Sequence, residues 1–469
     1  MFGFIYHIIN FQRLSFYTWC NYKWTGEVSL SLVKRLRHEI INSGFVTIKL
    51  CQWSLPRLQL LYNLQNVEWY QELEKVYDNC YIHDNSYTKE LYSMTMDKDF
   101  DLKYEIKEIV ASGSIGQVYK VKDRETGQIK ALKCKHPGIN LQYRLSVQFM
   151  RCMTFFLTLV ERIHYRVFPV ELETFYESLV SQVYLTNEAK NMKKMYSNFE
   201  DNEYIIIPKF YEGNDDILVM DYVPGVKFQD LDTTYTSKYK VCFLLFAALR
   251  QMIVIDSIIH GDLHKGNWKV VIDTTTSKTK YKIVLYDMGY CFSVDNSRDN
   301  FEAVEENNID KIVNIFPNIV NDVYNRPVKE TRLVVRDDLF DNLVRPISNK
   351  HLVNNILKLC KKHGYIIDGY FISLAIILEQ TACIFDDYLI NQNAEVNNIK
   401  VTKNETIYSE IMLKKDYPDL ISYCDTNKIF PELADYYRSR INNENLERKG
   451  IFEGCDFSSL IDPADALME

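Results

Sequence analysis

The stretch His260-Gly261-Asp262-Leu263-His264-Lys265-Gly266-Asn267 decides how this chain of 469 residues is interpreted. It has the spacing H-x-D-x-x-x-x-N and follows an apolar helical stretch that reaches Ile253. In phosphoryl transfer, an Asp at this position accepts the proton of the attacking hydroxyl, and an Asn five residues later reaches a magnesium ion on the phosphates. The spacing therefore predicts Asp262 as a catalytic residue and Asn267 as a metal ligand.

A second metal carboxylate is predicted downstream, in Tyr286-Asp287-Met288-Gly289. This segment is similar to the D-F-G triplet of phosphoryl-transfer sites, with Met in place of Phe as the apolar anchor. A strand pair, 268–272 and 282–286, separates it from the first motif. Asp287 is therefore the second predicted magnesium ligand, whereas His260 is expected to pack and to form hydrogen bonds rather than to act as an acid or base.

Upstream, the segment 111–118 reads A-x-G-x-x-G-x-V between two strand-like runs, 106–110 and 118–122. A loop with few side chains can close its backbone over a polyphosphate. The pattern alone is weak, because an ordinary turn has the same composition. The nucleotide-binding residues predicted from it are Ala111, Gly113, Ser114, Gly116 and Val118.

Lys133 ends the next strand-like run, 128–133, where a lysine can hold the α- and β-phosphates beneath such a loop. It needs a carboxylate to orient it. The candidate is Glu188, on a helix whose apolar face is formed by residues three and four apart. Met220 and Tyr222 follow in a hinge-like segment and are predicted to contact the nucleotide. Lys133 and Glu188 complete the predicted catalytic set with Asp262.

Changes of periodicity divide the chain into four parts. Residues 1–100 are predicted to be helical, in particular 32–41 and 58–77, and 101–225 form a small antiparallel-sheet lobe with inserted helices. Residues 226–400 form a larger helical lobe, and 401–469 a helical tail. The strand-like runs 204–207 and 217–221 fall in the first lobe. This order of elements is an α+β plan.

Charge and cysteine content argue against several functional classes, including nucleic-acid-binding and zinc-knuckle proteins. The formal charge of −8 and a pI near 5.7 predict no nucleic-acid partner. The 11 cysteines include no C-x-x-C pair, which argues against zinc knuckles and favours reduced thiols inside the cell. The apolar residues 1–20 are too interrupted to span a membrane, so they are expected to dock on protein or lie at a membrane interface. The stretch 147–160 suits a buried helix.

Residues 40–330 resemble the UbiB/AarF family of atypical, protein-kinase-like proteins. The family's K-L-G-Q-W segment, followed by an Arg, is similar to Lys49-Leu50-Cys51-Gln52-Trp53 with Arg57. Its S-I-G-Q-V loop corresponds to 114–118, its V-K-x-x-H-P-G-I segment to 132–139, and its E-A-x-N helix to 188–191. Its H-A-D-x-H-P-G-N loop corresponds to 260–267, with Gly261 and Lys265 substituted.

The resemblance implies a bilobal protein-kinase-like fold with an N-terminal helical extension. In this family the extension, here carrying Lys49 and Gln52 as regulatory residues, folds across the site where a protein kinase takes a peptide. That favours ATP hydrolysis or small-molecule phosphorylation. ATP or ADP and Mg²⁺ are the implied cofactors, isoprenoid-quinone or other lipid metabolism the implied role, and a lipid or membrane surface a further implied partner.

Three departures from the family pattern bear on these expectations. Cys51 stands where the family has Gly, which adds a side chain in a segment expected to pass close to the nucleotide. Gln182 and Tyr184 replace the family's E-x-D carboxylates, so their polar network with Lys49 is not expected. The loop Ala111-Ser112-Gly113 is closer to an ordinary glycine-rich loop than to the family's alanine-rich one.

Two other functions remain open. A small-molecule phosphotransferase of the aminoglycoside or choline kinase kind shares an H-G-D-L-H-x-G-N loop, although the helical extension argues against it. A degenerate nucleotide-binding scaffold is the second, since the E-x-D carboxylates are lost. Retention of Lys133, Asp262, Asn267 and Asp287 argues against a scaffold, because such proteins often lack one of these residues.

Overall fold

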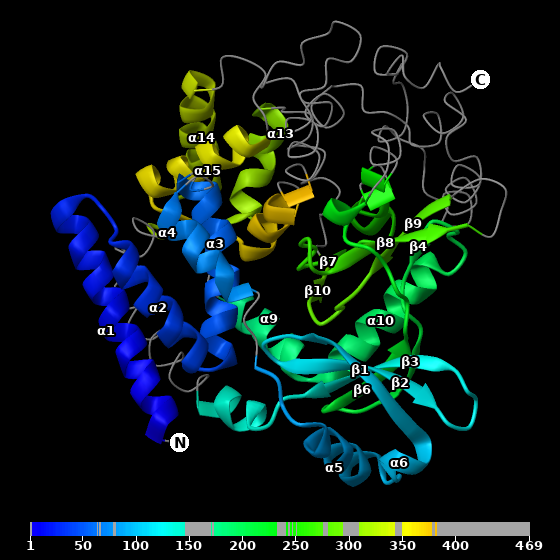
Figure 1. Ribbon diagram of the computed structural model, residues 1–469. Coiled ribbons are helices and arrows are strands. Elements are labelled where there is room, and N and C mark those ends of the chain that lie inside the picture. The colour runs from blue at the N-terminus through cyan, green and yellow to red at the C-terminus, as the bar shows by residue number, and fades with distance from the viewer. Residues whose placement is uncertain are drawn as a thin grey trace, which may run out of the picture. The chain divides into compact units, whose positions relative to one another are not determined.

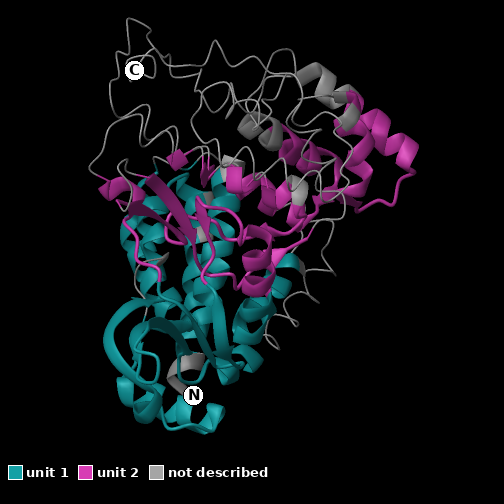
Figure 2. Cartoon of the chain, turned by 90° about the vertical axis from the view of Figure 1, so that its right-hand side faces the viewer, with its two compact units in different colours: residues 1–164, 171–190, 209–222 teal, residues 165–170, 191–208, 223–469 magenta. Residues whose placement is uncertain are grey.

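The computed structural model divides the chain into two compact units, which Figure 2 shows in different colours. Unit 1 comprises 1–164, 171–190 and 209–222, and unit 2 comprises 165–170, 191–208 and 223–469. The residues that the structure describes are 2–62, 64, 67–77, 81–145, 170, 173–231, 241–242, 244–245, 247–249, 251–274, 280–293, 309–342, 349–377 and 380–381.

The beginning of unit 1 is helical, as the sequence predicts (Figure 1). The expected helix 58–77 is wrong in one respect, because helix α3 ends at Tyr62 and a new helix begins at Glu68. The elements are α1 (Phe2–Thr25), α2 (Leu30–Asn42), α3 (Phe45–Tyr62), α4 (Glu68–Glu74), η1 (Lys75–Tyr77), α5 (Asn85–Met96) and α6 (Phe100–Lys103).

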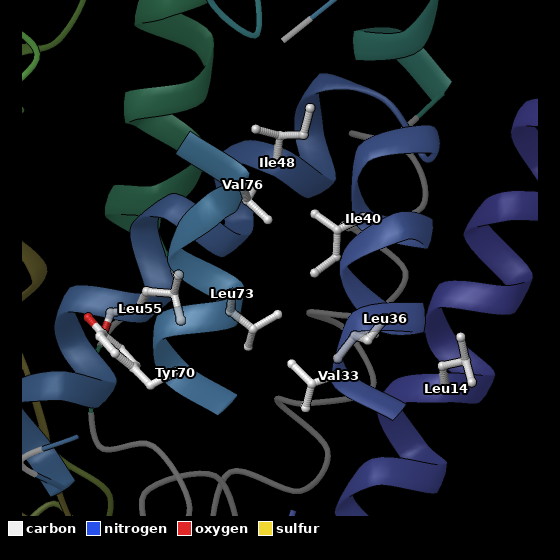
Figure 3. Packing of buried hydrophobic residues seen from close by; sticks show 9 residues of the cluster. All are labelled: Leu14, Val33, Leu36, Ile40, Ile48, Leu55, Tyr70, Leu73 and Val76. Carbon is white, nitrogen blue, oxygen red and sulfur yellow. The ribbon is translucent and has the colours of Figure 1, made fainter. Parts of the chain in front are cut away.

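A hydrophobic core holds the first four helices together. Val33, Leu36 and Ile40 recur every three or four residues on α2, so they share one face of that helix. Figure 3 shows this face directed at Leu73 and Val76, with Leu14 of α1 on the other side of α2. Burial of this apolar surface is the main stabilising contribution in the bundle.

An ion pair connects α2 to α4 beside this core. Arg37 Nε lies 3.0 Å from Glu72 Oε1, and Lys75 Nζ lies 2.6 Å from the other carboxylate oxygen. Glu72 is buried, so the two cations compensate a carboxylate that has lost its water.

A five-stranded sheet forms the second part of unit 1. Its order is β1-β2-β3-β6-β5, and every neighbouring pair is antiparallel, which confirms the predicted antiparallel sheet. Tyr92 of α5 and Phe100 of α6 pack into its core with Tyr104 and Tyr119. The strands are β1 (Tyr104–Ser112), β2 (Gly116–Asp123), β3 (Ile129–Lys135), β5 (Phe210–Gly213) and β6 (Ile217–Asp221).

Helices α9 (Glu173–Val183) and α10 (Leu185–Phe199) lie between β3 and β5 in the chain. Helix α9 lies in unit 1, and α10 contributes its first six residues to unit 1 and the rest to unit 2. Leu185, Ala189 and Met192 of α10 are buried, as expected of one apolar face.

Unit 2 contains a three-stranded sheet of order β4-β9-β8. Strand β4 (Ile205–Ile206) pairs in parallel with β9 (Lys280–Leu285), which pairs antiparallel with β8 (Trp268–Asp273). From the sequence, the strand-like run 204–207 is predicted to lie in the first lobe, whereas β4 belongs to the sheet of unit 2. A two-residue apolar strand contains no sequence signal that identifies its distant partner. A second pair joins β7 (Ile259–His260) to β10 (Cys291–Phe292).

The rest of unit 2 is mostly helical over its described residues. A π-helical turn, η3 (Gln251–Ile255), precedes β7, and β11 (Val320–Asp322) pairs with β12 (Tyr365–Ile367). The other elements are η2 (Phe228–Asp230), α13 (Ile309–Ile315), η4 (Phe316–Asn318), α14 (Val328–Asn342) and α15 (Asn349–His363).

Two expectations lie outside the described residues: the buried helix 147–160 and the helical tail 401–469. Among the described helices, none has the length and apolar character needed to cross a membrane.

We expect Ile40→Ala to lower the free energy of unfolding by about 2–5 kcal/mol, because it leaves a cavity in the bundle core. Ile9→Ala on α1 is the matched control, since Ile9 is largely exposed and its truncation should change stability by less than about 0.5 kcal/mol. Urea unfolding followed by fluorescence measures both. Equal effects of the two substitutions would contradict the packing of α2 in this core.

Candidate active site

Lys133 and Glu188 form an ion pair in unit 1. Lys133 Nζ lies 2.7 Å from one carboxylate oxygen of Glu188 and 3.0 Å from the other. Lys133 is on β3 between Val118 of β2 and Leu218 of β6, and Glu188 is in the first turn of α10. The Glu188 side chain is 2% exposed, so little water screens the attraction. Glu188, the carboxylate predicted from the sequence to pair with Lys133, therefore holds the Lys133 ammonium in place.

The glycine-rich loop joins β1 to β2. It closes with a hydrogen bond of 2.9 Å from Gly113 N–H to the Gly116 carbonyl. A Cβ on Gly116 would lie 2.7 Å from the Cys134 carbonyl oxygen, so only glycine allows this approach of β2 to β3. Ala111 and Val118 are paired across β1 and β2, and Ser114 is at the tip. The nucleotide contacts of these residues stay predictions.

Met220 and Tyr222, the predicted hinge contacts, lie at the end of β6. Met220 is buried opposite Ala131, and the Tyr222 ring faces the Lys120 ammonium at 4.9 Å from its centroid. Strand pairing on both sides therefore fixes Met220, and a cation–π contact adds to the position of Tyr222, which follows β6. The proposed role in nucleotide binding stays a prediction.

Lys49 and Gln52, to which the resemblance assigns a regulatory role, are half-buried on α3, and that role stays a prediction. Cys51, between them, packs against the core of the helical bundle, and burial raises the pKa of its thiol to about 12. Arg57 stacks on Trp53 at 3.9 Å and donates to the Trp53 carbonyl, so these two contacts join successive turns of α3. The extra side chain of Cys51 is therefore accommodated by the bundle.

The two residues in place of the family's E-x-D carboxylates, Gln182 and Tyr184, make uncharged contacts with other partners. Gln182 Nε2 donates to the Ser178 carbonyl of its own helix, and the Tyr184 ring packs edge-on to Tyr143. Neither side chain carries the negative charge that would pair with a lysine, in agreement with the sequence.

In unit 2, His260 organises the H-x-D-x-x-x-x-N loop. Its ring is fully buried, its Nε2 lies 2.8 Å from the Tyr286 carbonyl, and its Nδ1 accepts the Asp262 N–H at 3.2 Å. A carbonyl only accepts, so Nε2 carries the hydrogen and Nδ1 does not. Burial lowers the pKa of His260 and favours this neutral form. The predicted hydrogen-bonding role of His260 is confirmed.

Asn267 closes the same loop, because its side-chain Nδ2 donates to the Asp262 carbonyl at 2.8 Å. The Asp262 side chain is 38% exposed, and its Oδ1 lies 3.7 Å from His264 Nε2. The candidate catalytic carboxylate therefore remains accessible to water or an acceptor hydroxyl, while its backbone is held by His260 and Asn267.

Asp287 adopts a left-handed backbone conformation, with φ of 55°. Such a conformation costs about 1–2 kcal/mol in a residue other than glycine, although Asp tolerates it better than most. The following Met288 is fully buried, as expected of an apolar anchor, and its carbonyl accepts a hydrogen bond of 2.8 Å from Asn191 Nδ2. Packing and this bond therefore hold the strained turn.

The role of Asn191 was not predicted, although the residue is part of the E-A-x-N segment that resembles the family. Asn191 donates to the backbone carbonyl of Met288, 97 residues away in the chain. Every residue has a backbone carbonyl, so a sequence pattern cannot identify this acceptor.

The donor atoms of Asn267 and Asp287 suit a magnesium ion. Mg²⁺ prefers oxygen and is usually held by one or two protein ligands together with phosphate oxygens and water. No group of three or more His, Cys, Asp or Glu that could hold a metal occurs among the described residues, so a site built by such a cluster is not present there.

Comparison with known proteins places the chain in a family. Residues 75–314, about half of the chain, match the model of the ABC1 atypical kinase-like domain. The chain belongs to this family. It is the UbiB/AarF family that the sequence resembles, and the predicted kinase-like α+β fold is confirmed.

Three relatives are identical to the chain at about a quarter of the aligned positions. A probable serine/threonine-protein kinase abkC of Dictyostelium discoideum is 24% identical over 294 residues, covering 61% of this chain and 38% of that protein. Protein ACTIVITY OF BC1 COMPLEX KINASE 8, chloroplastic, of Arabidopsis thaliana is 25% identical over 300 residues (60% and 38%). A probable protein kinase UbiB of Shewanella denitrificans is 25% identical over 248 residues (50% and 44%). The match thus spans about two fifths of each relative's length.

We expect Gly261→Ala to lower the free energy of unfolding by about 1–3 kcal/mol, because its Cβ would lie 2.3 Å from the Tyr290 ring. The resemblance places Ala here in the family, so Tyr290 explains the departure. In a Tyr290→Leu background, Gly261→Ala should lower the free energy of unfolding by less. Thermal unfolding of the parent, the two single variants and the double variant gives the coupling energy. Gly113→Ala, which meets only an ordinary contact, is the control. Equal costs in both backgrounds would contradict this explanation.

Proposed function

We propose that the chain is an ATP- and Mg²⁺-dependent atypical kinase or ATPase. The buried Lys133–Glu188 pair carries the proposal, because a lysine held at two carboxylate oxygens is the arrangement that binds α- and β-phosphates in kinase-like proteins. Family membership supports it.

The proposed roles follow from the chemistry of each side chain. Lys133 would bind the α- and β-phosphates, with Glu188 orienting it. Asn267 and Asp287 would hold magnesium, which neutralises charge on the phosphates. Asp262 would position or deprotonate the acceptor, or the attacking water in an ATPase.

The acceptor is proposed to be a lipid-soluble small molecule, such as an isoprenoid, or a protein. The first choice rests on the resemblance to UbiB/AarF proteins and the second on the names of the relatives as protein kinases. The name of the Arabidopsis relative places that protein in the chloroplast, which supports a location inside a cell or organelle for this chain.

Purified protein should release ADP from Mg·ATP, and both Asp262→Asn and Asp287→Ala should reduce the rate by at least about 100-fold. Asp287→Ala should also weaken Mg²⁺-dependent ATP binding, measured by calorimetry, whereas Asp262→Asn should not. Asp310→Asn, at an exposed carboxylate of unit 2, is the matched control.

Each outcome separates the candidates. Equal Mg·ATP binding by Asp287→Ala and the parent would overturn the metal assignment. Binding without turnover under every condition would favour a nucleotide-binding scaffold. ADP release that depends on one soluble alcohol in an acceptor screen would favour the phosphotransferase.

We further propose that α1 binds an anionic membrane surface. Helix α1 packs on α2, and away from the packed residues it exposes large apolar or aromatic side chains. Aromatic rings of this kind suit a lipid interface. Helix α1 contains Arg13 and Lys23 and no acidic residue, although the whole chain is acidic. An excess of cations favours anionic headgroups. The exposed set is Tyr6, Ile9, Phe16, Tyr17, Tyr22 and Trp24.

The protein should sediment with vesicles that contain phosphatidylglycerol and less with vesicles of phosphatidylcholine alone. A Phe16→Ser and Trp24→Ser double variant should lower the partition coefficient about tenfold or more, since two apolar contacts are lost. Met94→Ser, which removes an exposed apolar side chain of α5, is the control. Equal sedimentation of the double variant and the parent would overturn the proposed surface.

A further inference from the structure

Five buried polar side chains lie in a continuous row beside the glycine-rich loop of unit 1. His136 Nδ1 lies 2.7 Å from His83 Nδ1, and His83 Nε2 lies 2.7 Å from Thr88 Oγ1. Thr88 Oγ1 lies 2.8 Å from the Tyr119 hydroxyl, to which Gln117 Nε2 donates at 2.7 Å. All five side chains are 5% exposed or less. Buried groups of this kind need partners.

The carbonyl at one end of the row fixes the hydrogens along it. His136 Nε2 lies 3.0 Å from the Gly113 carbonyl, which only accepts, so Nε2 carries the hydrogen. In a neutral ring, Nδ1 of His136 is then an acceptor, and His83 Nδ1 must donate to it. His83 Nε2 is left as an acceptor, and the Thr88 hydroxyl donates to it.

The other end of the row agrees with this direction. Thr88 then accepts from the Tyr119 hydroxyl, which itself accepts from Gln117. The Gln117 oxygen accepts the backbone N–H of His83 at 3.1 Å, so the amide is oriented independently of the row. Every donor meets an acceptor when both imidazoles are neutral and carry their hydrogens on opposite ring nitrogens.

Adding a proton breaks the row. A second hydrogen on His136 would reverse the bonds through His83 and Thr88, and the Tyr119 hydroxyl would then point at the Gln117 NH₂ group. Burial, and then the neighbouring His136, lower the pKa of His83 to about 4, and burial lowers the pKa of His136. The neutral arrangement is therefore the one present near pH 7.

His136 also binds the loop backbone at a second point. Its N–H donates to the Ile115 carbonyl at 2.9 Å, in addition to the ring bond to the Gly113 carbonyl. In a trans peptide the C=O and the following N–H point in opposite directions. The Ser114 N–H is therefore directed away from the His136 ring, and the Gly116 N–H away from the His136 backbone. Backbone N–H groups that point the same way out of a loop are a binding arrangement for phosphate.

The segment before α5 attaches to the loop as well, because Ser112 Oγ donates to the Tyr81 carbonyl. Tyr81 and His83 belong to one short segment, 81–84, so this segment contacts the loop both directly and through His136.

We propose that His83 and His136 are positioning residues for the phosphates of the nucleotide: the His136 ring, held by His83, fixes the Gly113 carbonyl so that the Ser114 N–H faces the ligand. The backbone N–H of His136 fixes the Ile115 carbonyl, and with it the Gly116 N–H, independently of the ring. The proposal rests on the proposed nucleotide-binding function. It adds a way for the segment 81–84 to influence phosphate binding without contacting the nucleotide.

The tautomers provide a test that needs no ligand. In two-bond ¹H–¹⁵N spectra of protein labelled at histidine, His83 should be the Nδ1–H tautomer and His136 the Nε2–H tautomer. His83→Gln and His136→Gln assign the two signals. Two rings with the same tautomer, or an imidazolium at pH 7, would overturn the row of hydrogen bonds.

Calorimetry with Mg·ADP tests the effect on the nucleotide. His136→Phe should weaken binding about fivefold to tenfold, the effect of one lost hydrogen bond that holds the loop. His136→Gln can still donate to the Gly113 carbonyl and should remain within about twofold of the parent. Tyr92→Phe, which removes a buried hydroxyl bonded to Glu212 elsewhere in unit 1, should not change binding.

The outcomes distinguish this inference from the function on which it rests. Failure of the parent to bind Mg·ADP or Mg·ATP would overturn both. Binding by the parent and equally tight binding by His136→Phe would overturn the positioning role alone. If His136→Phe does not fold, as judged by urea unfolding, the comparison passes to His83→Phe, which leaves His136 without its donor and should show the same weakening. Equal binding by folded His83→Phe and the parent would overturn the role.

Discussion

His260 donates its Nε2 hydrogen to the Tyr286 carbonyl and accepts the Asp262 N–H, so one buried ring joins the segments that carry Asp262 and Asp287. His136 acts in the same way in unit 1, where its ring donates to the Gly113 carbonyl of the glycine-rich loop. Both rings are buried, and burial lowers the pKa of each. A neutral imidazole can donate and accept at once, which is what joining two backbone segments requires. These three hydrogen bonds, together with those of Asn267 and Asn191, hold the segments that carry Asp262, Asp287 and the glycine-rich loop.

The candidate site residues of unit 1 and those of unit 2 differ in how their charge is compensated. Lys133 and Glu188 are mostly buried and compensate each other, because an unpaired charge there would be costly. Asp262 is partly exposed, so water can stabilise its carboxylate in the absence of a ligand. The residues that hold the glycine-rich loop, in contrast, are neutral: His83 and His136 form hydrogen bonds without adding charge beside it.

Departures from the family pattern are explained by packing within this chain. Gly261 is required because the Tyr290 ring occupies the space that a Cβ would need. Cys51 adds a thiol to α3, and the core of the helical bundle accommodates it. Gln182 bonds within its own helix in place of a carboxylate that would pair elsewhere. These substitutions are local adjustments that leave Lys133, Glu188, Asp262, Asn267 and Asp287 in place.

The sequence by itself determined the elements whose signals are local. Strand alternation located the hairpins of the antiparallel sheet, helical periodicity located α2 and α10, and fixed spacing within one loop identified Asp262 with Asn267. The pairing of Lys133 with Glu188 was inferred only because a known pattern supplied the second residue. Tertiary structure decided the rest. Strand β4 is two residues long and joins β9, and Asn191 and His136 bind backbone carbonyls. His83 meets a histidine 53 residues away. Such contacts depend on how the chain closes in space, and a backbone carbonyl is the same at every position, so no residue pattern records them.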